Sequence, residues 1–537
     1  MTFDEYKEQL LDYLKKEKEL TERDIQSHKD LSEEEKIEQG YLVKGCLVSS
    51  HIDDCYELTA RENNTKLRTG DRVILTRKDS EAKINATIVE NFFNTISITT
   101  NAIMDKLQTY DIHVTEAVLL DPLIQLLEEL EDGTSGSYYL KELCKIETPE
   151  KSGYGAIDVN NADFPNRLNE AQHEAVERVL ARPTLYCIQG PPGTGKTDVL
   201  STIAKNFSKK GKEVLIISNT HQAVNNALNK IAQYPDLPIV KVGEALKAQE
   251  LSDNIQLAKT YTEYIRTRPK KRRLRENGAI VGMTIHAAII NLGLRNSGFS
   301  PSVVLADEAG QIPLSFGSAI GAFGAGSIVF IGDDRQMPPI FHPDLVSDTM
   351  SVSIFTHLTN LYPDFKTVLD TTYRMNIEIT DYVSKHFYEP YGITLKAFRE
   401  PTFKPSIEFC NCPTEDGVLW REYNPEEAKI AAEKALEYTK KGLEVAVVTP
   451  FRKQVNCIRE YVTKAFEEHA LDEIPLVDTV ERLQGQDVDV IIISTSVSEA
   501  PYYLQLESFI LDQHRLNVMF SRAKEKVIVI KNDIVKI

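Results

Sequence analysis

A phosphate-binding loop limits the folds open to this chain more than any other segment of its sequence. Residues 190–197 read GPPGTGKT; they follow the apolar run TLYCIQ and precede a stretch of helical character. In such a strand–loop–helix, glycines let successive backbone N–H groups turn toward phosphate oxygens, and the helix adds its positive N-terminal dipole. Lys196 is then expected at the outer phosphates and Thr197 at Mg²⁺. The motif indicates a P-loop NTPase and nothing narrower, with a nucleoside triphosphate and Mg²⁺ as expected ligands.

Short apolar runs rich in β-branched residues alternate with helical stretches, which is typical of parallel sheets covered on both faces. TLYCIQ, EVLIIS, SVVLADE and SIVFIGD form one set. EVAVVTP, DVIIIST and KVIVIK, together with TVLD, SIEFC and LVDTV, form a second set. The break between the sets falls around residues 342–352, so we expect two tandem α/β domains, at 160–342 and 343–537.

The front of the chain has a different pattern, and 537 residues exceed what one core usually supports. Residues 1–40 predict charged helices, and 41–111 contain short β-rich pieces separated by turn residues, which predict a small barrel. Residues 112–159 return to helical character and end in a linker rich in Gly, Asn and Pro. The predicted fold class is α/β: two parallel-sheet domains and an N-terminal β-barrel on a helical stalk.

The net charge of -18 argues against a protein that coats nucleic acid with a basic surface, because phosphate contacts need Lys and Arg. Any such site must be a local groove. The densest basic run, RTRPKKRRLR, lies in a short insertion at 244–278, and Lys271, Arg272 and Arg273 are candidate phosphate contacts. A solvated helix face is an equally good interpretation of this run.

The sequence also indicates a compartment. It has no run of about 18 apolar residues, and its first residues lack the apolar stretch of a secretory signal. Seven scattered cysteines suit a reducing environment, so we expect a cytoplasmic protein. Cys410 and Cys412 are close together, but no matching pair follows at zinc-ligand spacing, so we expect them to pack in a core.

Two adjacent carboxylates form the second chemical motif. Asp307 and Glu308 come directly after the apolar run SVVLA, at the expected carboxyl end of a buried strand. Asp307 is then a candidate for holding Mg²⁺, with Thr197, and Glu308 for orienting and deprotonating an attacking water. A solvated strand end is the alternative, which the upstream phosphate-binding loop disfavours.

Nine ordered stretches between residues 168 and 530 carry a family resemblance: LNEAQHEAV, GPPGTGKT, SNTHQAVNNAL, LADEAGQ, IGDDRQMPPI, TTYRMN, VVTPFRKQ, DTVERLQGQDVDVIIIS and RLNVMFSRAKEKVIVI. Their order and spacing resemble superfamily 1 helicases, in the branch of the up-frameshift helicase of nonsense-mediated decay, senataxin and the immunoglobulin mu-binding helicase. Kinases, GTPases and transporter ATPases do not match this series. The resemblance implies two RecA-like domains with ATP in the cleft between them.

The resemblance also implies a role for each matching position at the nucleotide. Gln172 would read the adenine edge, Tyr373 would pack on the base, and Gln336 would sense the γ-phosphate. Arg374 and Arg522 would reach across the cleft, where a planar, permanently charged guanidinium suits the transferred phosphoryl group; alone, each would be an ordinary surface ion pair. The implied catalytic set is Lys196, Asp307, Glu308, Gln336, Arg374 and Arg522. The implied nucleotide contacts are Gln172, Gly190, Pro191, Pro192, Gly193, Thr194, Gly195, Lys196, Thr197, Tyr373, Gly485 and Asp487. Thr372, Gly310 and Asp487 depart from the usual residues of the family.

Loops at the ends of both sheets supply the nucleic-acid contacts that the resemblance implies. The expected residues are Asn219, Thr220, Pro338, Pro339, Thr449, Pro450 and Thr479. Small hydroxyls and exposed amides bind phosphates without reading bases, so recognition should be sequence-independent. Helix-cap or turn roles are the alternative for Asn219, Thr220 and Thr479.

The function that follows is an ATP-dependent helicase or translocase. The family resemblance implies that it moves from 5′ to 3′ on single-stranded DNA or RNA and unwinds duplexes. We expect a monomeric motor that does not bind a membrane. An ATP-gated clamp or remodelling subunit, which grips nucleic acid without processive unwinding, is the alternative.

Overall fold

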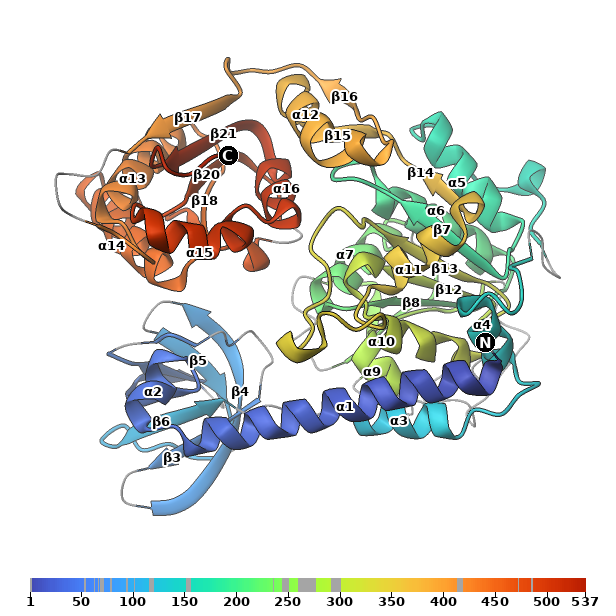
Figure 1. Cartoon of the computed structure of the whole chain (residues 1–537), viewed down its shortest axis with the longest axis horizontal. Helices are drawn as coiled ribbons and strands as arrows, with labels where there is room; N and C mark the ends of the chain where they lie inside the picture. The colour runs from blue at the N-terminus through green and yellow to red at the C-terminus, as the bar shows by residue number, and fades with distance from the viewer. Residues whose placement is uncertain are drawn as a thin grey trace.

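The computed structural model of the chain describes residues 2–537 apart from 53–54, 62, 66, 68–71, 78–79, 93–94, 101, 115–119, 151–155, 235, 244–250, 259–276, 291–300, 413–418, 472 and 484–485. Within these residues the chain forms a closed barrel followed by two α/β domains with parallel sheets (Figure 1). The described helices are too short or too polar to span a membrane.

The first α/β domain is built on an eight-stranded sheet in the order β10-β9-β11-β8-β12-β13-β7-β14, with parallel pairs. Its strands are β7 (Leu185–Gln189), β8 (Val214–Ser218), β9 (Ile239–Val242), β10 (Ile255–Ala258), β11 (Ile280–Thr284), β12 (Val303–Asp307), β13 (Ile328–Gly332) and β14 (Lys366–Val368). Its helices include α5 (Glu170–Leu180), α6 (Lys196–Lys209), α7 (His221–Ile231), α9 (Ile285–Ile290), α10 (Leu314–Ser318) and α11 (Ile354–Leu361). Strands β7, β8, β11, β12 and β13 are buried along their whole length, as a sheet covered on both faces requires.

The division between the α/β domains differs from the prediction. The TVLD segment forms β14, which pairs with β7 of the first sheet and not with the second sheet. Buried side chains as far as Leu369 belong to the first core, so this domain continues past the predicted boundary at 342/343. After the polar stretch 342–352 the chain folds back, and Ile354 N donates to Ile312 O. A surface loop within one domain has the same composition as a linker, which is why the sequence suggested a break there.

The second α/β domain has a five-stranded parallel sheet in the order β17-β21-β20-β18-β19. Its strands are β17 (Ile407–Asn411), β18 (Val445–Thr449), β19 (Leu476–Thr479), β20 (Val488–Ser494) and β21 (Ala523–Lys531). Its helices are α12 (Ile377–Val383), α13 (Pro425–Thr439), α14 (Arg452–Glu468), α15 (Ala500–Ile510) and α16 (Gln513–Ser521), among the described residues. A short parallel pair, β15 (Thr371–Asn376) and β16 (Lys396–Arg399), lies where the chain passes between the domains (Figure 1).

Alternation along β20 shows that this sheet, too, is covered on both faces. Ile491 and Ile493 enter one core cluster, whereas Val490 and Ile492 enter another. Cys412 is buried in the second cluster and Cys410, partly buried, packs against it. The prediction of parallel α/β sheets, and of core packing for these cysteines, is confirmed.

Before the α/β domains, the strands close into a barrel in the order β1-β2-β5-β4-β3-β6, with antiparallel neighbours. They are β1 (Leu42–Ile52), β2 (Cys55–Thr59), β3 (Arg72–Arg77), β4 (Ser80–Phe92), β5 (Thr95–Thr99) and β6 (Thr109–Val114). Alternate residues point inward, such as Ile96 and Ile98 in β5, so the interior is a packed core.

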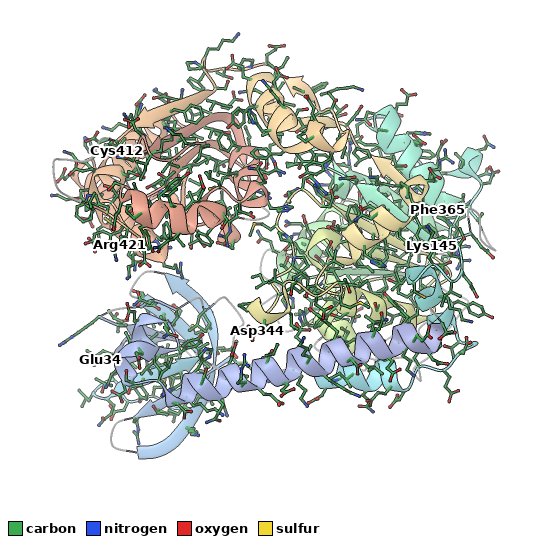
Figure 2. The ribbon with its side chains drawn as sticks, viewed as in Figure 1. Glu34, Lys145, Asp344, Phe365, Cys412 and Arg421 are labelled. Carbon is green, nitrogen blue, oxygen red and sulfur yellow. The ribbon has the colours of Figure 1, made fainter. Side chains whose placement is uncertain are left out.

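A long helix connects the barrel with the first domain. Helix α1 (Phe3–Asp30) begins on that domain, beside α3 (Leu120–Glu128) and α4 (Ser135–Leu143), and runs to the barrel and α2 (Glu33–Glu38) (Figure 1). Its buried residues, among them Leu10 and Leu14, belong to the core of the first domain. Farther along, Arg23 pairs at 2.8 Å with Asp344, which Figure 2 labels above the helix.

The barrel also contacts the second domain. The Arg452 guanidinium, at the start of α14, donates to Thr65 O at 2.7 Å and to Asp478 Oδ1 at 3.0 Å. Nearby, Lys453 Nζ lies 3.8 Å from Glu38 Oε1. The chain therefore returns from its C-terminal domain to touch its N-terminal one.

Candidate nucleotide cleft and nucleic-acid surface

The phosphate-binding loop lies between β7 and α6, at the carboxyl edge of the first sheet. Gly193 and Gly195 adopt left-handed φ angles of 73° and 80°. A Cβ at Gly193 would come within 2.5 Å of Arg374 Cβ, and one at Gly195 within 2.4 Å of Gln172 Nε2. Backbone conformation and close neighbours thus both require glycine here. Lys196 Nζ donates to Gly190 O, so the ammonium lies against the loop itself.

Residues at the entry to the second domain bind the same loop. Thr372 Oγ1 donates to Pro192 O at 2.9 Å, and Tyr373 N donates to Gly193 O at 2.8 Å. The unusual Thr372 is therefore fully buried against the loop. The TTYRMN segment forms β15 and binds the start of the second domain to the loop.

Two candidate base contacts lie at one end of the loop. Gln172 is the third residue of α5, where its side chain forms a capping box with Asn169, and its Nε2 donates to Thr194 O at 2.9 Å. Asn169 Nδ2 donates to Tyr373 Oη at 2.9 Å. The amide and the aromatic ring that sequence analysis expected at the base are thus connected through one residue.

The two carboxylates lie at the end of β12. Asp307 is buried, and burial together with the neighbouring Glu308 raises its pKa to about 7, although Lys196 acts in the opposite direction. Glu308 adopts a left-handed φ of 52°. A Cβ at Gly310 would lie 2.5 Å from Asp333 O, so the close approach of two loops explains this departure from the family pattern.

Two arginines of the second domain lie across the cleft. Arg522, at the end of α16, is buried, and its Nη2 donates to Gln336 Oε1 at 3.1 Å. Arg374 Nη1 donates to Ser521 O at 3.2 Å, and its Nε lies 3.5 Å from Asp487 Oδ2. Burial, and then the neighbouring Arg374, lowers the pKa of Arg522 to about 10.

These residues fit a magnesium-bound nucleotide. Arg522 Nε is buried without a hydrogen-bond partner among the described residues, a costly state that an anion would relieve. Thr197 and Asp307 would hold Mg²⁺, which needs only one or two protein ligands beside phosphates. The described residues contain no group of three or more His, Cys, Asp or Glu that could hold a metal alone.

A buried network that no sequence motif indicated lies behind the cleft. Asp333 Oδ2 accepts from Gln336 Nε2 at 2.7 Å and from Tyr388 Oη at 2.6 Å. Asn517 Nδ2 donates to Tyr388 Oη at 2.9 Å and to Arg335 O at 2.8 Å. Tyr388 belongs to no motif, and only the tertiary fold brings it to Asp333.

The expected nucleic-acid contacts follow strand ends of the two sheets. Asn219 and Thr220 follow β8, Pro338 and Pro339 follow β13, Thr449 and Pro450 stand at the end of β18, and Thr479 ends β19. Since carboxyl ends of parallel strands share one edge of a sheet, each domain brings its candidates to one edge.

Several of these candidates also have a structural role. Thr220 caps α7 by accepting from Ala223 N at 3.2 Å, which is the alternative that the sequence left open. Thr449 is fully buried, and its Oγ1 lies 3.1 Å from Ser496 Oγ. Gly485 and the basic residues Lys271, Arg272 and Arg273 lie outside the described residues, so their roles stay predictions.

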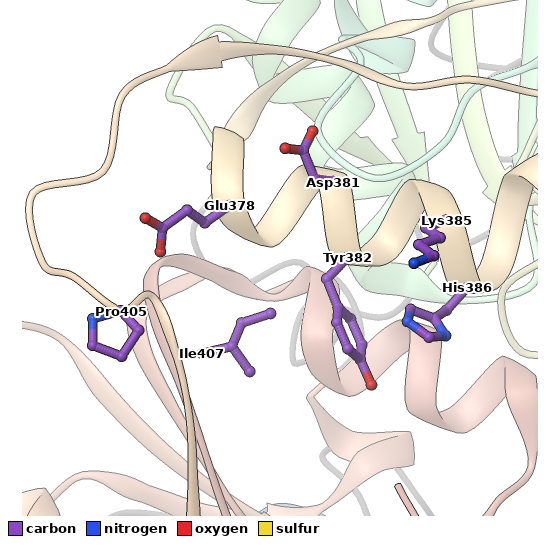
Figure 3. Close-up of a pocket in the computed structure, with 7 residues that line it drawn as sticks. All are labelled: Glu378, Asp381, Tyr382, Lys385, His386, Pro405 and Ile407. Atoms are coloured by element: carbon purple, nitrogen blue, oxygen red, sulfur yellow. The ribbon is translucent and has the colours of Figure 1, made fainter.

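A surface pocket elsewhere lies on the second domain. It has a volume of about 350 Å³, and Figure 3 shows its lining: Glu378, Asp381, Tyr382, Lys385, His386, Pro405 and Ile407. None of the expected site residues lines it, so it is separate from the cleft.

The fold and the cleft define a P-loop ATPase with two parallel α/β domains. Two AAA-domain families match the chain, one over residues 167–277 and one over 350–533. A DNA replication ATP-dependent helicase/nuclease of Arabidopsis thaliana is 25% identical over 528 residues, covering 88% of this chain and 38% of its own length. An uncharacterized ATP-dependent helicase of Methanocaldococcus jannaschii is 26% identical over 498 residues, covering 72% of this chain and 71% of its own length.

These comparisons support a superfamily 1 helicase, an enzyme class that hydrolyses ATP. The chain spans 38% of the Arabidopsis relative and 29% of a similar helicase/nuclease of Schizosaccharomyces pombe. The Arterivirus nonstructural protein 10 helicase is a structural neighbour at 13% identity and a TM-score of 0.42, covering 90% of this chain and 78% of that one. The narrower branch of the up-frameshift helicase stays a prediction.

Proposed function

We propose that the chain is an ATP-dependent helicase or translocase that moves from 5′ to 3′ on single-stranded DNA or RNA and unwinds duplexes. The observation that carries the proposal is the bond across the cleft, in which Arg522 of the second domain donates to Gln336 of the first. A buried side chain of the first domain is thereby tied to a buried arginine of the second. Such a contact makes the angle between the domains sensitive to the nucleotide.

In this proposal each side chain of the cleft has one task. Lys196 neutralises the outer phosphates, Thr197 and Asp307 hold Mg²⁺, and Glu308 orients the attacking water and accepts its proton. Gln336 senses the γ-phosphate, and Arg374 and Arg522 stabilise the charge that develops there. Gln172 and Tyr373 position the base. The bound nucleotide supplies the phosphoanhydride bond whose cleavage drives the cycle.

We further propose that the strand lies along the carboxyl edges of the two sheets, on the loops after β8, β13, β18 and β19. Loop amides and hydroxyls there bind phosphates, so binding is independent of sequence. The barrel on its helical stalk serves as an accessory domain beside this path, and the motor works as a monomer.

An ATP-gated clamp is the second candidate, and the contact between barrel and second domain favours it. The Arg452–Thr65 hydrogen bond joins two parts of the chain that a translocating strand would have to separate or pass beneath. A clamp would use ATP to open this contact without processive unwinding.

Tailed duplexes test the proposal. ATPase activity is measured with single-stranded DNA and RNA side by side, and unwinding with duplexes that carry either a 5′ or a 3′ tail. We expect strand-stimulated hydrolysis and unwinding of the 5′-tailed duplex alone. Unwinding of only the 3′-tailed duplex would reverse the polarity, and stimulated hydrolysis without unwinding would favour the clamp.

A further inference from the structure

Tyr388 is a fully buried side chain to which the proposed function gives no task. It is the last residue of η9 (Ser384–Tyr388), a π-helical turn that continues α12. Such turns interrupt regular helical hydrogen bonding and are frequent at functional sites. This turn carries the Tyr388 hydroxyl out of the second domain and onto Asp333 of the first, at 2.6 Å.

Tyr388 contacts Asp333, which lies in the same loop as Gln336, the proposed γ-phosphate contact. Asp333 Oδ2 accepts from both Tyr388 Oη and Gln336 Nε2, and Asp333 Oδ1 accepts from Arg335 N at 3.1 Å. Tyr388 and Gln336 therefore share one carboxylate oxygen. If Gln336 turns toward a phosphate, Tyr388 becomes the remaining side-chain donor to that oxygen.

The same loop extends toward the proposed strand surface. Pro338 and Pro339 follow Gln336 after a single residue. A displacement at the prolines is thus transmitted over a few bonds to Gln336, provided that Asp333 stays fixed. The Tyr388 hydroxyl supplies this fixed point.

Asn517 completes the connection to the catalytic arginine. It lies on α16, the helix that ends at Arg522, and its Nδ2 donates both to Tyr388 Oη and to Arg335 O. The hydroxyl thus stands between the loop of the first domain and the helix of the second. Without it, buried Asp333 loses a donor and Asn517 loses an acceptor, and buried polar groups left unsatisfied are unfavourable.

We propose that Tyr388 is a positioning residue that couples strand binding at the Pro338–Pro339 loop to the placement of Gln336 and Arg522. The inference rests on the proposed function, because it assigns the regulation of the same cleft. It acts through other groups and touches no reacting atom.

Tyr388→Phe removes the hydroxyl alone and tests the coupling. ATP hydrolysis is measured with and without single-stranded oligothymidylate and oligouridylate. With the strand present we expect kcat to fall about tenfold, the effect of one lost buried hydrogen bond, while KM for ATP changes by less than about twofold. A strand-stimulated kcat equal to that of the unmodified chain would overturn the proposal.

Tyr139→Phe is the matched control. Tyr139 is also buried, and its hydroxyl donates to Gly317 O at 2.9 Å, between α4 and α10 of the first domain. It should lower thermal stability and leave the stimulated kcat unchanged. An equal fall of kcat in both variants would show that loss of stability, not coupling, causes the effect.

Hydrogen exchange provides a readout that does not depend on activity. In the nucleotide-free chain, the Arg335 amide should exchange about tenfold faster in Tyr388→Phe and at the original rate in Tyr139→Phe, because its acceptor Asp333 is no longer fixed. Unchanged exchange would overturn the positioning role. Absence of strand stimulation in the unmodified chain would instead refute the proposed function, and the exchange rates would still decide the role of Tyr388.

Discussion

Glu308, the proposed proton acceptor, has a strained backbone conformation. Its left-handed φ of 52° is uncommon for a residue with a Cβ, and such strain concentrates at functional sites. Its carboxylate accepts a long hydrogen bond, 3.3 Å, from Gln311 Nε2, so the carboxylate is weakly held. A loosely held carboxylate beside buried Asp307 suits a proton acceptor better than a structural residue.

Substitutions in the hydrolysis set test this assignment. Lys196→Ala should abolish turnover, and Glu308→Gln should slow hydrolysis by about 10² to 10⁴ while ATP still binds, because general-base catalysis contributes that factor. Turnover and binding of a fluorescent ATP analogue are measured on the same samples. Near-normal turnover in Glu308→Gln would exclude it as the base.

Lys241 is a buried residue whose charge should destabilise the fold. It is fully buried in β9, and its ammonium nitrogen has no hydrogen-bond partner among the described residues. Burial lowers its pKa to about 7, so at higher pH the unfolded chain alone binds this proton, and stability rises as pH increases from about 7 toward the ordinary lysine pKa of about 10.4. The charge is therefore most unfavourable at and below neutral pH.

Lys241→Met removes the charge and shortens the unbranched side chain by one heavy atom. We expect a higher Tm, by about 2–4 °C for each kcal/mol recovered, with a larger gain near pH 6 than near pH 10. Calorimetry across this range checks the sign. A lower Tm, or a gain that does not vary with pH, would contradict it.

At the scale of elements, one loop of the second domain depends on a single buried carboxylate. Glu427, on α13, is fully buried and accepts from Ser494 Oγ at 2.7 Å and from Ser496 N at 2.8 Å, just after β20. Ser496 has a left-handed φ of 68°, and its hydroxyl lies 3.1 Å from Thr449 Oγ1. The carboxylate thus holds the loop in a strained conformation against a proposed strand contact.

Glu427→Ala should release this loop and weaken binding of labelled oligothymidylate about tenfold, the effect of losing one or two buried hydrogen bonds. Fluorescence anisotropy with a non-hydrolysable ATP analogue measures it. The control is Glu437→Ala on the same helix, because Glu437 forms an exposed pair with Lys441. Equal affinity in both variants would separate the loop from strand binding.

The parts of this fold that sequence could predict are those with local patterns. The phosphate-binding loop and buried runs such as VVLAD carry their own strand or turn chemistry. By contrast, β14 has three residues, and its assignment to the first sheet depends on pairing with β7, far away in the chain. Tyr388 gave no signal, since its partners Asp333 and Asn517 lie 55 and 129 residues away. Contacts that exist only after folding have no periodicity to read.

At the scale of the whole molecule, the contact between Arg452 and Thr65 predicts how strands are captured. We expect Arg452→Ala to let the barrel separate from the second domain, so that circular single-stranded DNA, which has no end to thread, binds faster than it does to the unmodified chain. Stopped-flow fluorescence compares circular and linear strands. Arg459→Ala is the control, because Arg459 also pairs with Asp478, at 3.3 Å, but is bound within the second domain. Identical capture rates for all three proteins would contradict the prediction.

The long helix α1 gives this contact a mechanical meaning. Three bodies joined end to end can each pivot freely, but once the last touches the first they form a closed linkage, in which no hinge turns alone. A rotation of the second domain about β15 must then either break the Arg452 hydrogen bond or rotate the barrel with it. Helix α1 connects the barrel to the first domain. The N-terminal half of this helix packs in the core of the first domain, through Leu10 and Leu14 among others. If the second domain rotates while the Arg452 hydrogen bond stays intact, α1 must therefore bend beyond this fixed half, where Arg23 pairs with Asp344.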